Sequence, residues 1–151
     1  MSLGSISEDL LGVAVPFFNA AERALLVSYL VRLELAEGED LFGVGEPVDG
    51  LYFLVRGRLA VRKLNPLYGK AQVVALLDPG AMVGEAALLG AGNHRAEVRA
   101  VVAAQFLFFD NSALERLSQD YFQLYFGLFR RALEVSSLRL DKVSERLAVV
   151  L

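Results

Sequence analysis

The stretch between residues 31 and 110 constrains the fold of this chain most. Its apolar residues fall in short runs, several of them alternating with polar residues, and the runs are separated by Gly, Pro, Asn and Asp. Such runs are typical of β-strands, and the residues between them favour tight turns. The predicted strands cover 31–36, 51–56, 59–64, 71–77, 97–102 and 104–109. We therefore expect a compact antiparallel β roll (jelly roll) of about eight strands.

Helices are expected on both sides of the roll. Ser7 precedes Glu8 and an apolar run, and Asn19 precedes a second helical run, as N-cap residues do. Pro16 separates the two. After residue 110 no proline follows, and Gly127 alone interrupts a helical pattern that continues to the end. The predicted fold is mostly β, with N-terminal helices over 1–30, the roll over 31–110 and a long C-terminal helix over 111–151.

Length and composition favour one domain over 1–151. The chain has 151 residues, 55% of them hydrophobic and 22% charged, which suffices for one core. No uncharged apolar run approaches the length of about 18 residues that spans a membrane. We expect a soluble, cytoplasmic protein that does not enter a membrane.

Charge and residue usage exclude several classes of function. A net charge of −3 and a pI near 5.2 give no basic field, so we expect no nucleic-acid binding by this chain alone. The chain has no cysteine and one histidine. A thiolate or multi-histidine metal site is therefore excluded, and a cupin-like metalloenzyme does not fit. We expect no metal, no cofactor and no enzymatic activity.

The predicted C-terminal helix carries an apolar seam at coiled-coil spacing. Its positions alternate four and three residues apart, which predicts a homodimer through this helix. The alternative is that the stripe packs on its own domain. The seam positions are Phe122, Phe126, Phe129, Leu133, Ser136, Leu140, Val143 and Leu147.

A second informative segment begins with Gly84-Glu85 and continues through a short apolar run to residue 89. The first N–H groups of a helix lack acceptors within the helix and attract anions such as phosphate. Gly84 lets the backbone approach closely, and the Glu85 carboxylate suits a sugar hydroxyl. The nearby cations are His94 and Arg95. The structural alternative is a turn glycine followed by an acidic residue at a helix N-terminus.

At these residues the chain resembles the cyclic nucleotide-binding domain family. Residues 37–61 resemble its strand pairs with glycine turns, and residues 76–100 (LLDPGAMVGEAALLGAGNHRAEVRA) resemble its phosphate-binding cassette. The resemblance implies that Glu85 holds the ribose 2′-hydroxyl and that the backbone of Gly84, Ala86 and Ala87 faces the cyclic phosphate. It also implies that Leu76 and Val83 surround the purine and sugar.

The cassette departs from the family pattern at its cation. Counting back from Ala100 places His94 where the family has a phosphate-clamping arginine, and Arg95 where it has a small hydroxyl residue. An imidazole is mostly neutral at pH 7, whereas a guanidinium stays charged and binds phosphate bidentately. Arg95 could supply the charge, a one-residue shift in the 90–93 loop could restore the register, or the site could be degenerate.

Residues 130–140 resemble the dimer helix of the catabolite activator branch, where a threonine-serine pair reaches the adenine. Ser136 and Ser137 fall at similar places after a one-residue adjustment; Ser136 also reads as a polar position within the seam. The leading hypothesis is a module for signal transduction and transcription regulation that binds cyclic AMP or cyclic GMP. The alternative is a degenerate cassette in a structural or interaction dimer.

Overall fold

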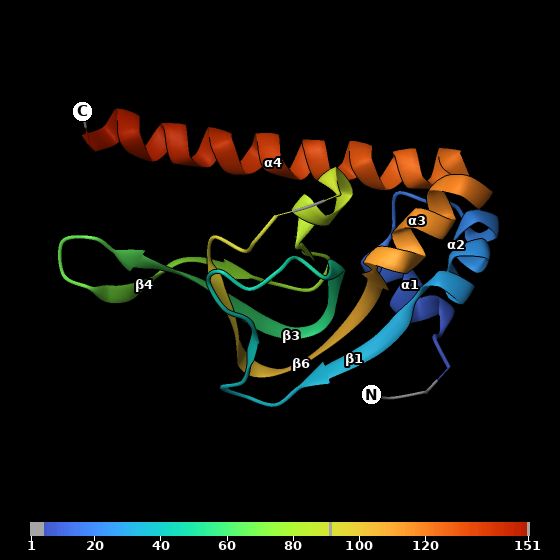
Figure 1. Cartoon of the computed structure of the whole chain (residues 1–151), viewed down its shortest axis with the longest axis horizontal. Coiled ribbons are helices and arrows are strands. Elements are labelled where there is room, and N and C mark those ends of the chain that lie inside the picture. The colour runs from blue at the N-terminus through green and yellow to red at the C-terminus, as the bar shows by residue number, and fades with distance from the viewer. Residues whose placement is uncertain (1–4, 91, 151) are drawn as a thin grey trace.

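The computed structural model describes residues 5–90 and 92–150 and consists of a β roll flanked by helices (Figure 1). The N-terminal helices α1 and α2 lie beside α3 at one end, and α4 runs along the whole molecule. The helical elements are α1 (Glu8–Ala14), α2 (Ala20–Leu26), the 3₁₀ turns η1 (Val27–Tyr29) and η2 (Glu85–Leu89), α3 (Asn111–Asp120) and α4 (Phe122–Val150). The strands are β1 (Val31–Leu35), β2 (Asp40–Phe42), β3 (Gly50–Asn65), β4 (Lys70–Leu77), β5 (Met82–Val83) and β6 (Glu97–Asp110).

The strands form one antiparallel sheet in the order β1-β6-β3-β4, in which β2 also pairs with β6 and β5 with β3. The fold class predicted from the sequence is confirmed, but the expectation of about eight strands is wrong: the described residues form six. Two pairs of predicted strands merge into the long strands β3 and β6. Gly57 does not turn the chain; it lies within β3 with φ +95°. Glycine is required there, because a Cβ would clash with the Ala103 carbonyl oxygen on β6.

The predicted caps form at the N-terminal helices. The Ser7 hydroxyl accepts a hydrogen bond from the Leu10 amide, and Asn19 forms a capping box with Glu22. Each cap satisfies amide groups that have no acceptor within the helix. Both helices therefore begin where the sequence predicted them.

The single C-terminal helix predicted over 111–151 is instead two helices. The backbone leaves the helical region at Tyr121 (φ −141°, ψ 71°), and the chain resumes as α4. Gly127 lies inside α4 without interrupting it. The Tyr121 amide still bonds to the Leu117 carbonyl, and the Leu124 and Tyr125 amides both donate to the Tyr121 carbonyl. These bonds satisfy the backbone through the bend, so neither a proline nor a glycine is needed there.

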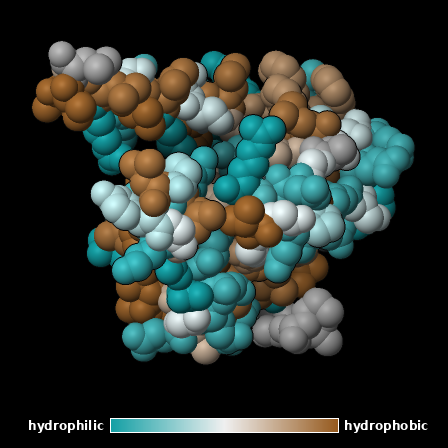
Figure 2. All heavy atoms as spheres, turned by 60° about the vertical axis from the view of Figure 1, so that its left-hand side comes forward, coloured by the Kyte–Doolittle hydropathy of each residue, from teal (hydrophilic) through white to brown (hydrophobic). Residues whose placement is uncertain are grey.

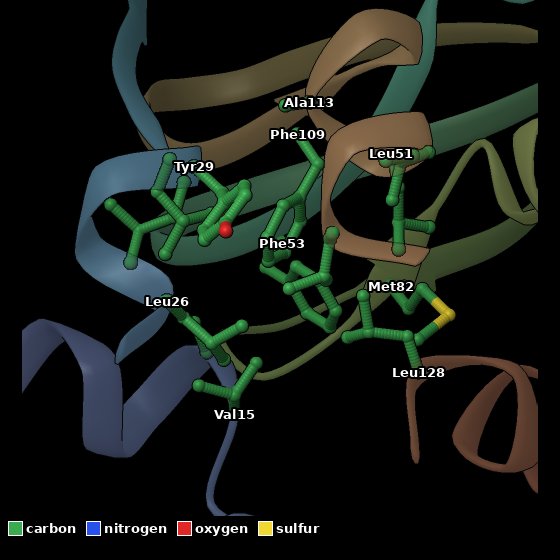
Figure 3. Close-up of a cluster of buried hydrophobic side chains, with 14 of the residues drawn as sticks. Val15, Leu26, Tyr29, Leu51, Phe53, Met82, Phe109, Ala113 and Leu128 are labelled. Carbon is green, nitrogen blue, oxygen red and sulfur yellow. The ribbon is translucent and has the colours of Figure 1, made fainter. Parts of the chain in front are cut away.

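The strand β3 separates two hydrophobic clusters. Successive side chains of a strand point to opposite faces, and here Phe53 points toward the helices while Tyr52 and Leu54 point into the roll. Figure 3 shows the helix-side cluster, in which Val15, Leu26 and Leu128 surround Phe53. Because both faces of the strand are covered, β3 reads as the continuous apolar run LYFLV rather than as an alternating one.

Gly127 permits the close approach of the α1–α2 connection to α4. A Cβ at this position would lie 2.5 Å from the buried Phe18 ring. We expect Gly127→Ala to lower the free energy of unfolding by about 1–3 kcal/mol, the usual cost of overpacking a core. Gly12→Ala is the matched control, since its Cβ meets nothing within 4 Å and should stabilise α1. Urea unfolding of both variants measures the difference; equal stability of the two would contradict the packing role.

The two faces of α4 have different environments. Leu124, Leu128 and Ala132 are buried against the rest of the chain. The apolar seam positions lie on another face, and each is exposed in the isolated chain, with Leu140 at 66% and Phe129 at 37%. Figure 2 shows apolar side chains gathered along the top of the molecule, where α4 lies. The alternative that the seam packs on its own domain is therefore wrong.

Candidate functional site

The cassette begins at Gly84, which links β5 to η2 in a left-handed conformation (φ +79°). A Cβ at Gly84 would lie 2.6 Å from the Gly50 carbonyl oxygen, so both the conformation and the space require glycine. The following residues, Ala86 and Ala87, pack toward the helix-side core. Gly84 thus places the short turn η2 against the roll, with Glu85 at its start.

Glu85 forms an ion pair with α4. The Arg139 guanidinium donates from Nη1 to Glu85 Oε1 at 2.9 Å and from Nη2 to the Met82 carbonyl oxygen at 2.9 Å. Both side chains are partly exposed. Arg139 was not among the site residues predicted from the sequence, although its four-residue spacing from Val135 and seven-residue spacing from Ala132 place it on the inward side of α4.

His94 lies buried in the roll rather than on an open loop, with 7% of its surface exposed. Its ring stacks on Phe42 with centroids 3.4 Å apart and planes within 5°. Its Nε2 has no hydrogen-bond partner among the described residues. Burial lowers the pKa of His94, while the negative charges of Asp49, Glu46 and Glu85 oppose this shift. The imidazole is therefore neutral near pH 7.

Burial of neutral His94 predicts a pH effect on stability. Because the folded protein lowers its pKa, the unfolded chain binds the proton more readily, and stability should fall as the pH drops below about 6.5. The loss is at most about 1.4 kcal/mol per pH unit for one proton. His94 is the only histidine, so His94→Phe should reduce this slope between pH 7 and 5.5. Chemical denaturation across this range tests it, and identical slopes in both proteins would refute it.

The other predicted site residues are only partly brought together. Arg95 is exposed and forms no ion pair within the described part of the chain. Val83 is buried beside Tyr52, whereas Leu76 on β4 is 51% exposed. The interior of the roll around Val83 is aromatic: Tyr52 stacks on Phe108 and donates its hydroxyl hydrogen to Asp49.

A mainly apolar groove of about 280 Å³ lies between η2 and α4. Ser136 lines it, together with Glu85 and Leu89, whereas Ser137 is exposed and does not. Phe129 and Leu133 line the same groove and belong to the seam of α4. The groove therefore joins the cassette to the exposed face of the helix.

A β roll with a glycine-acidic 3₁₀ turn and a long covering helix matches the fold of solved cyclic nucleotide-binding domains. The family model of the cyclic nucleotide-binding domain matches residues 32–121, more than half of the chain. The chain belongs to the cyclic nucleotide-binding domain family, as its cassette residues predicted. This family is regulatory.

Two similar proteins are described as cyclic AMP-responsive. The chain is 30% identical to the cyclic AMP receptor protein of Thermus thermophilus over 130 residues, covering 80% of this chain and 56% of that protein. It is 24% identical over 125 residues to the CRP-like cAMP-activated global transcriptional regulator of Mycobacterium tuberculosis, covering 83% and 54%. The chain thus spans about half the length of the curated relatives it matches.

Solved structures share the fold. The crystal structure of a cyclic nucleotide-binding domain from Methylobacillus flagellatus superposes with a TM-score of 0.85 at 23% identity, covering 95% of this chain and 83% of that one.

Among residues 5–90 and 92–150, no helix is long and apolar enough to cross a membrane. The same residues contain no group of three or more His, Cys, Asp and Glu side chains placed to hold a metal ion.

Proposed function

We propose that this chain is a ligand-sensing module that binds a cyclic nucleotide, with cyclic AMP preferred, at the cassette around Gly84 and Glu85. The single observation that carries the proposal is the left-handed Gly84 followed by η2, which presents the Glu85 carboxylate at the edge of the roll. Membership of the family and the chain's similarity to a cyclic AMP receptor protein and a cAMP-activated regulator support the ligand class. In this proposal residues 1–151 act as one unit.

The cation for the phosphate in this proposal is Arg95. It is exposed beside His94, and a guanidinium keeps its charge at any cellular pH. His94 contributes shape instead, since its neutral ring is held against Phe42. In this proposal Leu76 and Val83 contact the nucleotide from the roll, and Ser136 contacts it from the groove that this serine lines between η2 and α4. Ser137 lies outside that groove and takes no part.

The output in this proposal is a homodimer formed through α4. The seam side chains are apolar and exposed, and burying each is worth about 1.5–3 kcal/mol. Phe129, Leu133 and Ser136 also line the groove beside Glu85. In this proposal the ligand and the partner's helix therefore contact the same groove. Regulation of transcription, as named for the relatives, would then need a further module.

A second candidate function is a dimer whose cassette binds no nucleotide. The observation that favours it is the burial of His94 as a neutral ring stacked on Phe42, which offers no positive charge to a phosphate. Calorimetric titration of the purified protein with cyclic AMP and with cyclic GMP separates the two candidates. Saturable binding of either nucleotide supports the sensor, and no heat with either at millimolar concentration supports the degenerate dimer.

A further inference from the structure

Arg139 joins two parts of the chain that are far apart in sequence. It lies on α4, yet both of its hydrogen bonds reach the cassette, to Met82 and Glu85 on either side of the Val83-Gly84 link. One planar group therefore holds the helix and the start of η2 together. A guanidinium suits this arrangement because its N–H groups diverge from a rigid plane toward two separate acceptors.

Arg139 is also the last partly buried residue of α4 within the described chain. The fully buried positions of α4 end at Ala132. Val135 and Arg139 are partly buried, and every residue from Leu140 to Val150 is exposed. Among residues 5–90 and 92–150, the part of α4 after Ala132 makes hydrogen bonds to the cassette only through Arg139.

The Arg139 ion pair occupies the carboxylate that the proposed ligand needs. Glu85 Oε1 accepts from Arg139 at 2.9 Å, so a ribose hydroxyl that approaches this oxygen must share it or displace the guanidinium. With 40% and 33% of the side chains exposed, the pair is of the modest strength that a ligand can overcome. Release of Arg139 would also free α4 beyond Ala132.

We propose that Arg139 is a latch: it holds Glu85 and the C-terminal half of α4 together in the ligand-free protein, and a ligand hydroxyl at Glu85 releases the helix. This inference rests on the proposed function, and it names Arg139 as a positioning residue that acts through Glu85. The latch makes ligand affinity lower than the cassette alone would give. It also converts occupancy of one carboxylate into a change in a helix that carries the exposed seam.

Lys142 provides a matched control for the latch. It lies about one turn beyond Arg139 and lines the same groove of about 210 Å³, between residues 80–82 and α4. It forms no ion pair within the part of the chain that the structure describes. Lys142→Gln thus removes one positive charge near the cassette without touching Glu85, whereas Arg139→Gln removes the charge and both hydrogen bonds.

Hydrogen exchange of the ligand-free proteins tests the contact itself. We expect Arg139→Gln to speed amide exchange in residues 82–90 relative to wild type, and Lys142→Gln to leave it unchanged. Arg139→Lys should restore part of the protection, since an ammonium pairs with Glu85 but lacks the planar fork. Exchange in Arg139→Gln equal to that of wild type overturns the latch.

Calorimetric titration with cyclic AMP tests what the contact does to ligand binding. We expect Arg139→Gln to bind about fivefold more tightly than wild type, the scale of a half-exposed ion pair, and Lys142→Gln to match wild type. Equal or weaker binding by Arg139→Gln overturns the latch and leaves the proposed function standing. Absence of binding by all the proteins overturns the proposed function. Hydrogen exchange alone then tests whether Arg139 holds the cassette through Glu85.

Discussion

Replacement of Leu140 by Glu should convert the proposed dimer to monomer. Leu140 is exposed in the isolated chain and lies at the middle of the seam in the C-terminal half of α4. A symmetric dimer loses two buried leucines, worth about 1.5–3 kcal/mol each, and acquires two buried carboxylates. The dissociation constant should rise at least about a hundredfold. Sedimentation equilibrium of wild type and variant measures this change.

Leu138 offers the control for this substitution. It is 58% exposed, two residues from Leu140, but it faces the groove beside Arg139 rather than the seam. Leu138→Glu should therefore remain dimeric. A wild-type protein that sediments as a monomer at tens of micromolar, or a Leu138→Glu protein as monomeric as Leu140→Glu, would rule out the seam as the interface.

Removal of the Glu85 carboxylate should abolish most nucleotide binding while leaving the fold intact. A hydrogen bond to a charged group contributes about 1.5–3 kcal/mol, so Glu85→Ala should weaken cyclic AMP binding by about tenfold or more. Its cost in stability should stay below about 1 kcal/mol, because the ion pair with Arg139 is partly exposed. Thermal melts with and without nucleotide report both quantities.

Glu97→Ala is the control for Glu85→Ala. Glu97 also accepts from an arginine, Arg62, at 2.8 Å, but it lies on β6 away from the turn η2. It should show a comparable small loss of stability and unchanged affinity. Unchanged affinity in Glu85→Ala, combined with a clear loss of stability, would instead assign Glu85 a purely structural role.

Local sequence patterns predicted where several elements begin, but not where strands merge or where a helix bends. The N-caps Ser7 and Asn19 and the turn η2 are defined by residues within one helical turn, and each forms as expected. The merging of strands at Gly57 and the bend at Tyr121 could not be predicted. The merging depends on the close approach of Gly57 to Ala103 on β6. The bend depends on hydrogen bonds that the Tyr121 backbone forms with Leu117, Leu124 and Tyr125.

The candidate site likewise contains residues that local sequence could predict and residues that only tertiary contacts place. The sequence placed Gly84-Glu85 at the start of a short helical segment, and the structure has both residues there. The left-handed conformation of Gly84 is known only from the structure. It could not place His94, because stacking on Phe42 joins residues far apart in the chain. Arg139 was missed for the same reason, since an arginine in an amphipathic helix gives no local sign of a carboxylate contacting it across the fold.

By itself, the sequence determined the order of the helical and β regions and the apolar seam of α4, because spacing along one strand or helix sets which residues share a face. It also indicated the family, through the resemblance of residues 37–61 and 76–100 to the family's motifs. The tertiary structure alone decided which charges meet. It buried the only histidine as a neutral group, left Arg95 exposed and brought Arg139 to Glu85. These outcomes depend on distances between segments more than fifty residues apart, which no local periodicity encodes.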